Sequence, residues 1–300
     1  MEWERIEVRD ENGVGFDLIQ HEELILPATL QHMEHEKQLK MIREFKYKKG
    51  DILLCSYPKT GTHWLSNLVY FLVTPGSVES MKTVQPTLMD LVPLEPLEKV
   101  EHSRVLNSHH RINRLPFDHL EQGGKIIVLT RDPKDAMVSY KYHVQNFEML
   151  NRSNLSWNNF FDIWVNGKLP CGSFFDYYNS WEKALKENKE LNVLIVHFEH
   201  LKTNGLKELR RIQDFLEVNN TEERLKEILD KCNVTKMKAD IDTGEVESLL
   251  KDSDGKSFLY RKGESGDWKN HFTVALNEHF DNVLEERFKD SIFNAEFLAG

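Results

Sequence analysis

Residues 53–73 read LLCSYPKTGTHWLSNLVYFLV: an apolar run, a short loop with Pro58, Lys59 and Gly61, and then an amphipathic helical pattern. A strand that leads through a short glycine-containing loop into a helix gathers backbone N–H groups and a helix N-terminus around one point. Such a point attracts an anionic group, and Lys59 adds a full positive charge. The segment predicts a P-loop-like anion site after the first core strand. A tight turn with a surface lysine would give the same pattern.

The composition of the chain is that of an ordinary globular protein. Of its 300 residues, 40% are hydrophobic and 29% are charged, and we expect a single domain over residues 1–300. The net charge of −10 opposes non-specific binding to nucleic acid, which needs a basic surface. No apolar run approaches the ~20 residues of a membrane helix, and the acidic N-terminus lacks a signal-peptide core. These features predict a soluble, cytoplasmic protein with no membrane partner.

The cysteines do not suggest a metal site. There are three, an odd number with no CxxC pair and no histidine-rich spacing: Cys55, Cys171 and Cys232. Neither a disulfide framework nor a zinc site is therefore indicated, and we expect reduced thiols.

Strand-like and helix-like patterns alternate along the chain. Nearly continuous apolar runs predict strands at 51–57, 104–107, 125–130 and 192–198. Such runs are typical of parallel strands that are covered on both faces. Helical patterns follow Gly61 and Pro133 and also span 174–189, 205–217 and 221–232. We therefore predict an α/β fold with a central parallel sheet flanked by helices.

Basic residues follow several of the predicted strands. Ligands of open parallel sheets bind beyond the carboxyl ends of the strands, which is where Lys59, His109 and Arg131 fall. Ser139 lies eight residues after Arg131 on the next predicted helix, and a third basic cluster lies in the glycine-containing segment 261–263. Each cluster alone could be solvated surface. Together they predict a ligand with two anionic ends, one bound at Lys59 and the other at Arg131, Ser139 and 261–263.

Three segments resemble the motifs of the cytosolic sulfotransferase family. YPKTGTHW (57–64) is similar to the family's YPKSGTTW loop, and RDPKDAMVSYKYH (131–143) to its nucleotide 3′-phosphate motif. RKGESGDWKNHFTVALNEHFD (261–281) is similar to its RKGxxGDWKxxFTVxxNExFD signature. The resemblance covers residues from about 40 to 288. It implies transfer of a sulfonate group from 3′-phosphoadenosine 5′-phosphosulfate (PAPS) to a hydroxyl or amine of a small acceptor, without a metal and with PAP as the product.

The resemblance also implies roles for individual residues. Lys59 would contact the oxygen that bridges the donor phosphate and the leaving sulfonate, where negative charge develops. His109 stands at the place of the catalytic histidine in the family's KTHLP motif and would be the general base, with His110 as its competitor. The implied cofactor-binding residues are Lys59, Thr60, Gly61, Thr62, His63, Trp64, Arg131, Ser139, Phe198, Asn233, Arg261, Lys262 and Gly263.

Some residues depart from the family's motifs. The departures that fall on the predicted nucleotide site are His63, Phe198, Asn233 and Thr235. Trp64 is retained and is expected to stack on the adenine. The segment 108–115, SHHRINRL, is basic and polar where family members place apolar contacts with the acceptor, which favours a polar or anionic acceptor. The predicted walls of the acceptor pocket are the long connection 75–100, the segment 239–257, most of which is expected to be a loop, and residues 143–147.

A fourth motif concerns assembly. Lys269, Thr273, Val274 and Glu278 match the family's KxxxTVxxxE dimerisation motif at every defined position. The resemblance implies a homodimer with a small two-fold contact, in which each segment meets its own copy.

Two other function classes remain open. A catalytically inactive nucleotide-binding homologue is favoured by His63, Phe198 and Thr235, but retention of the base His109 argues against it. An ATP- and magnesium-dependent P-loop phosphotransferase would use Asp132 as its metal carboxylate. Against it, the first glycine of the Walker pattern GxxxxGK is missing, and the lysine precedes the glycine of the loop instead of following it.

Overall fold

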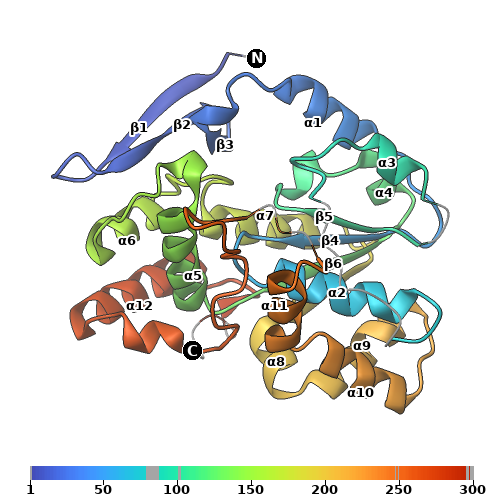
Figure 1. The fold of residues 1–300 in the computed structure, drawn as a ribbon. Helices are drawn as coiled ribbons and strands as arrows, with labels where there is room; N and C mark the ends of the chain where they lie inside the picture. The colour runs from blue at the N-terminus through green and yellow to red at the C-terminus, as the bar shows by residue number, and fades with distance from the viewer. Residues whose placement is uncertain are drawn as a thin grey trace.

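A four-stranded parallel sheet forms the centre of the computed structural model, which describes residues 2–78, 88–100, 103–246, 248, 250–294 and 297 (Figure 1). The strands are β4 (Ile52–Ser56), β5 (Val105–Ser108), β6 (Lys125–Thr130) and β7 (Val193–His197). They lie in the order β5-β4-β6-β7, and each neighbouring pair is parallel. The four predicted strands and the predicted single-domain α/β class are confirmed.

Helices cover both faces of this sheet. In chain order they are α1 (His35–Glu44), α2 (Thr62–Val73), α3 (Glu95–Glu98), α4 (Phe117–Glu121), α5 (Pro133–Asn146), α6 (Trp157–Val165), α7 (Phe174–Glu187), α8 (Phe198–Thr203), α9 (Gly205–Leu216), α10 (Glu222–Lys231), α11 (Val234–Asp242) and α12 (Val274–Phe288). Short 3-10 turns lie at η1 (Ala28–Leu30), η2 (Ile112–Arg114), η3 (Glu148–Leu150) and η4 (Asp267–Asn270). No helix in these described segments is both long enough and apolar enough to cross a membrane.

The two faces of the sheet belong to two apolar clusters. Successive side chains of a strand point to opposite faces, so Leu53 and Cys55 of β4 pack on one side while Ile52 and Leu54 pack on the other. The first cluster includes residues of α5, α6, α7 and α12, and the second includes residues of α2, α8, α9 and α10. Every residue of β4 is buried, which explains why its sequence is apolar without alternation.

A second, antiparallel sheet precedes the core and was not predicted. It consists of β1 (Glu4–Arg9), β2 (Gly15–His21) and β3 (Leu24–Pro27), in the order β1-β2-β3. Phe16 and Leu18 of β2 are completely buried and belong to the same apolar cluster as Leu53. This sheet therefore adds side chains to the main core.

The two predicted connections contain short stretches of regular structure. The range 239–257 begins inside α11, which ends at Asp242. Asn233 caps this helix by accepting a hydrogen bond from Thr235 N (2.9 Å), and Met237 of the helix is buried. Only residues 239–242 of the range belong to α11, which agrees with the prediction that most of it is a loop, and Lys251 and Ser257 form an isolated bridge. The range 75–100 contains α3. Residues 79–87, 247 and 249 of these ranges lie outside the described residues.

Candidate active site

The loop after β4 presents the N-terminus of α2 to the carboxyl edge of the sheet. Gly61 precedes α2 with φ of +107°, and Lys59 also has a left-handed backbone, with φ of +69°. A Cβ atom at Gly61 would lie 2.7 Å from Cδ2 of Phe198. Both the backbone conformation and the close approach require glycine here. Phe198, one of the departures from the family's motifs, thus packs directly against the loop between β4 and α2.

Hydroxyl groups fix the shape of this loop. Thr60 Oγ1 donates a hydrogen bond to Tyr57 O (2.7 Å), and the hydroxyls of Ser56 and Thr62 lie 2.6 Å apart. Thr60 is completely buried. Because these contacts lie within a few residues of one another, the loop is held in one conformation before any ligand binds.

His63 faces a tyrosine of the C-terminal segment. Its Nδ1 is hydrogen bonded to the hydroxyl of Tyr260, and the two rings lie 4.9 Å apart. Tyr260 directly precedes Arg261 in the chain. The imidazole of His63, which stands where the family's YPKSGTTW loop has a threonine, therefore links the first turn of α2 to the basic segment 261–263.

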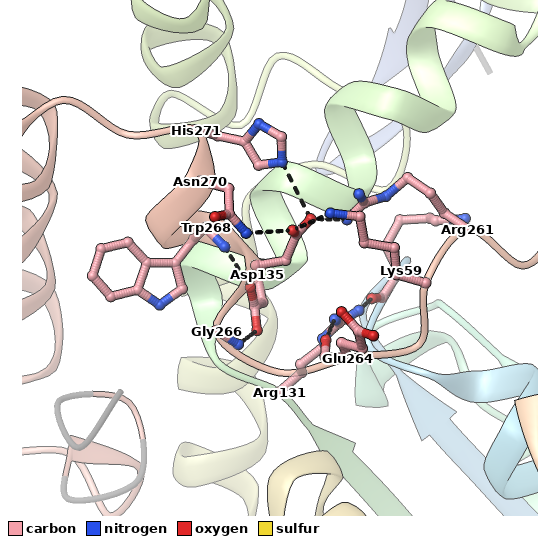
Figure 2. Close-up of polar contacts among 11 residues, drawn as sticks. Lys59, Arg131, Asp135, Arg261, Glu264, Gly266, Trp268, Asn270 and His271 are labelled. Carbon is pink, nitrogen blue, oxygen red and sulfur yellow. Dashed lines mark hydrogen bonds and ion pairs between the residues drawn. The ribbon is translucent and has the colours of Figure 1, made fainter.

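Arg131 joins the same two segments from the end of β6. Its Nη1 donates to Lys59 O and its Nη2 to Glu264 O, both at 3.0 Å (Figure 2). The guanidinium lies 4.4 Å above the ring of Phe198 and only 8% of the residue is exposed. Its Nε is buried and has no hydrogen-bond partner among the described residues. Arg131 is thus built into the site with hydrogen-bonding capacity to spare.

Two carboxylates order the C-terminal segment. Asp135 of α5 accepts hydrogen bonds from Gly266 N (2.6 Å) and Trp268 N (3.0 Å) (Figure 2). Asp267 forms an ion pair with Arg261 and accepts a hydrogen bond from Lys262 Nζ at 2.6 Å. The segment is thereby docked against the N-terminal half of α5.

Asp267 remains ionised at its position between these bases. Burial disfavours its charge, but hydrogen bonds from Lys262, Asn270 and Arg261 outweigh burial and hold the pKa of its carboxyl well below the usual range. Asp267 therefore aligns Arg261 and Lys262 and compensates part of their charge.

Lys59 lies among positive charges. Burial, followed by repulsion from Arg131 and Arg261, lowers the pKa of its ammonium to about 8. Figure 2 shows the three side chains close to one another. Lys59 makes no ion pair within the described part of the chain. An anion between these cations would relieve their repulsion, so the arrangement is suited to a strongly anionic ligand.

His109 is oriented by the last residue of β4. Its Nδ1 lies 2.7 Å from Ser56 O, and because a carbonyl oxygen accepts hydrogen bonds, Nδ1 carries the proton and Nε2 is left as the acceptor. Its backbone N donates to Asp90 Oδ2 (2.6 Å). Burial is the main cause that lowers the pKa of His109. A neutral imidazole of this tautomer can take up a proton at Nε2.

His110 has different surroundings. Only 8% of it is exposed, and its Nε2 lies 3.6 Å from Asp90 Oδ1. Its backbone N donates to Ser108 Oγ (3.0 Å), which in turn donates to Asp90 (2.6 Å). The two neighbouring rings therefore have different partners. The His109 ring contacts Ser56 of β4, whereas the His110 ring lies near the carboxylate of Asp90.

The other predicted nucleotide residues lie around this centre with less direct contact. Ser139 is partly exposed on α5, two turns after Arg131. Gly263 packs on α11, since a Cβ there would lie 2.6 Å from Cγ2 of Val234, beside Asn233. The ring of Trp64 meets Phe198 edge-on at 5.2 Å. The structure thus brings the three predicted basic clusters together.

Sequence reasoning assigned no role to several residues that shape the site. They are Asp90, Asp135, Tyr260 and Asp267. Each carboxylate is one of 49 acidic residues in the chain, so residue type alone does not mark it. For Asp135 and Asp267, the available signal was a single acid placed within a few residues of a basic cluster.

The basic segment 108–115 is compensated by the protein itself. Arg111 pairs with Asp176 (3.1 Å), and Arg114 pairs with Glu22 (3.1 Å) and Glu23 (3.0 Å) of the N-terminal sheet. These arginines hold the N-terminal sheet and α7. The charge of this segment consequently gives no reason to expect an anionic acceptor.

The residues of the expected dimerisation motif all lie on the surface. Lys269, Thr273, Val274 and Glu278 are exposed, and Val274 is 76% exposed although it is apolar. Thr273 also caps α12 by accepting from Leu276 N at 3.2 Å. The motif therefore begins a helix and presents an apolar side chain to solvent.

Comparison with known proteins agrees with this geometry. The profile of the sulfotransferase domain matches residues 49–292. Human sulfotransferase 1C2 is 31% identical over 283 residues, 90% of this chain and 92% of its own length. Dog sulfotransferase 1B1 is 33% identical over 258 residues, 82% of this chain and 86% of its own length.

A solved structure extends the similarity to the fold. Mouse sulfotransferase SULT7A1 complexed with PAP has a TM-score of 0.77 and 26% identity, and the match covers 93% of this chain and 97% of that one. Sequence profile, relatives and fold all span the segments that carry Lys59, Arg131 and Arg261. The chain accordingly belongs to the sulfotransferase family and is a sulfotransferase enzyme.

Proposed function

We propose that the enzyme transfers the sulfonate of PAPS to a hydroxyl or amine of a small-molecule acceptor. The observation that carries the proposal is the cluster of Lys59, Arg131 and Arg261 beside a neutral His109. It combines a site for a multiply charged anion with a proton acceptor. The mouse relative of known structure binds PAP, which supports the same nucleotide here.

The proposed reaction assigns one role to each of Lys59 and His109. The bond between sulfur and the bridging oxygen breaks, and its electron pair stays on the phosphate of PAP. A new bond forms between sulfur and the acceptor oxygen or nitrogen, whose proton passes to Nε2 of His109. Lys59 stabilises the negative charge that develops on the bridging oxygen. The proton and both electron pairs are thus accounted for without a metal.

The donor is held at two ends. Backbone N–H groups and side chains of the loop and first turn of α2 (Lys59, Thr60, Gly61, Thr62, His63 and Trp64) bind the phosphosulfate. Arg131, Ser139 and the segment Arg261–Gly263 bind the 3′-phosphate, while Phe198 and Asn233 border the adenine. The unused Nε of Arg131 supports this role, because a buried donor normally has a partner.

Two outcomes would favour the other classes. In the phosphotransferase class Asp132 would hold magnesium, yet its carboxylate caps α5 by accepting from Lys134 N (2.8 Å) and Asp135 N (3.0 Å). We therefore expect PAPS-dependent transfer to a mixed panel of phenols, steroids, amines and catechols that survives EDTA. ATP-dependent, EDTA-sensitive transfer would indicate a phosphotransferase. Tight PAP binding without any transfer would indicate an inactive homologue.

Further proposals concern the protein as a whole. The exposed Val274, with Lys269, Thr273 and Glu278, supports a homodimer through this motif. The contacts of Arg114 with the N-terminal sheet support one domain over residues 1–300. The cysteines are free thiols, which agrees with a cytoplasmic location.

A further inference from the structure

His143 lies on α5 one helical turn after Ser139, on the same face of the helix. Its ring packs against two other partly exposed aromatic residues. The ring centroids lie 4.8 Å from that of Phe147, at the end of α5, and 5.4 Å from that of Phe258, in the segment before Arg261. His143 therefore belongs to an aromatic wall built from two distant parts of the chain.

The imidazole of His143 has polar atoms that this wall does not use. Nδ1 is buried and has no hydrogen-bond partner among the described residues. Nε2 makes no hydrogen bond within the same residues either, but it is not enclosed, since the ring is partly exposed. An enclosed N–H without a partner is unfavourable. The tautomer with its proton on Nε2 is therefore favoured, and it presents a donor at the accessible edge.

A buried ring connects the wall to the loop after β4. The centroid of the Tyr140 ring lies 6.0 Å from that of His143 and 6.1 Å from that of Tyr57, two residues before Lys59. Burial lowers the pKa of His143 well below its usual value, and repulsion from Lys59, and from His109 when that ring is protonated, lowers it further. Both groups therefore lie within electrostatic range of the ring. His143 is neutral at physiological pH and can donate one directed hydrogen bond. A phenylalanine would supply the same ring contacts with Phe147 and Phe258 without an unpaired nitrogen.

We propose that His143 determines acceptor specificity by donating a hydrogen bond from Nε2 to a second oxygen on an aromatic acceptor. The Phe147 and Phe258 rings also lie 6.5 Å apart, so the three rings pack on one another. The acceptor class is then a flat aromatic alcohol with a further hydroxyl or carbonyl oxygen, its ring packing on the accessible side of this cluster. This inference rests on the proposed function, because it assigns the partly exposed side of the wall to the acceptor.

A comparison of one naphthol with matched naphthalenediols tests the inference. We would titrate 2-naphthol and a series of dihydroxynaphthalenes, which differ by one hydroxyl, against the intact protein by calorimetry, with and without PAP. In parallel, kcat/KM would be measured with PAPS. His143→Phe keeps the aromatic contacts and removes the donor, whereas His143→Gln keeps a donor and removes the ring.

We expect the best diol to bind more tightly than 2-naphthol in the unaltered protein. His143→Phe should abolish that preference, a ~2- to 10-fold loss for the diol, the scale of one neutral hydrogen bond, with no loss for 2-naphthol. His143→Gln should weaken both ligands but retain the preference. Equal losses for both ligands in His143→Phe, or no diol preference in the unaltered protein, would overturn the inference.

The titrations with and without PAP distinguish a failure of this inference from a failure of the proposed function. If PAP fails to bind and no sulfonate is transferred, the proposed function fails, but the comparison of the two ligands without nucleotide still decides the role of His143. If sulfonate is transferred and His143→Phe prefers the diol over 2-naphthol as strongly as the unaltered protein does, the proposed function stands. His143 then contributes only its ring contacts.

Discussion

The guanidinium of Arg131 donates a hydrogen bond to the backbone carbonyl of Lys59, 3.0 Å away. A side chain at the end of β6 thus fixes the backbone of the loop that follows β4. A lysine could not hold Lys59 O and Glu264 O together, because it lacks the planar fork of arginine. We expect Arg131→Lys to weaken PAP binding by ~10-fold or more, the scale of a hydrogen bond to a charged group. Calorimetric titration would measure this, with Arg210→Lys, in an exposed ion pair with Glu222, as the matched control. Similar losses in both variants would contradict the assignment.

Removing the imidazole of His109 should affect turnover and not nucleotide binding. His109→Ala should lower kcat by ~10²-fold or more, the usual contribution of a general base. The neighbouring variant His110→Ala is the control, since His110 faces Asp90. PAP affinity, measured alongside, should stay close to that of the unaltered protein in His109→Ala. An inactive His110→Ala together with an active His109→Ala would show that the roles are reversed.

Arg261 should distinguish nucleotides by their 3′-phosphate. Arg261→Ala should weaken PAP by ~10-fold or more but leave adenosine 5′-phosphate almost unaffected, because the charged hydrogen bond exists only in the first complex. Equilibrium titration of both nucleotides gives the two losses. Equal losses would place Arg261 away from the 3′-phosphate.

The low pKa of Lys59 predicts how PAP binding depends on pH. In the protein without ligand this ammonium has a pKa of about 8, and a bound anion raises it. Affinity should therefore be fully present below pH 8 and fall as the pH rises through 8. Lys59→Arg, which stays charged, should remove this decline between about pH 7 and pH 10. An unchanged decline in the variant would assign the titration to another group.

The exposed Val274 predicts a fragile assembly. We expect a dimer in solution that Val274→Glu converts to a monomer, because two like charges would meet near the two-fold axis. A contact of this size is smaller than a standard interface and should dissociate readily. Sedimentation at micromolar concentration would measure both states. A monomeric unaltered protein, or a dimeric variant, would exclude the motif as the interface.

The parallel sheet could be predicted because its signal is local. Leu53, Ile127 and their neighbours form continuous apolar runs followed by glycine or proline, and burial on both faces requires such runs. The antiparallel sheet was missed because its strands carry charge on their exposed face: Arg5 and Arg9 pair with Asp17 across β1 and β2. Cross-strand pairs of this kind cannot be recognised until the register is known.

The site was predictable to the same extent. Lys59, Arg131 and Arg261 could be grouped because each follows a strand end or lies in a glycine-rich segment. The partners that orient them could not, since Asp267, Asp135 and Tyr260 act through contacts between segments far apart in the chain. The partners of Arg114 could not be predicted for the same reason, because Glu22 and Glu23 lie in the turn between β2 and β3.

The N-terminal sheet has a practical consequence for truncation. Ile25 O of β3 accepts a hydrogen bond from Cys171 N (2.9 Å), and Gly172 O accepts one from the buried hydroxyl of Tyr57 (2.8 Å), two residues before Lys59. A fragment that starts at residue 49, where the family profile begins, would lose this brace and uncover the seat of Phe16. The family profile therefore begins inside a packed part of the protein, and we expect a protein shortened at that boundary to be a poor substitute for the whole chain in crystallisation or assay.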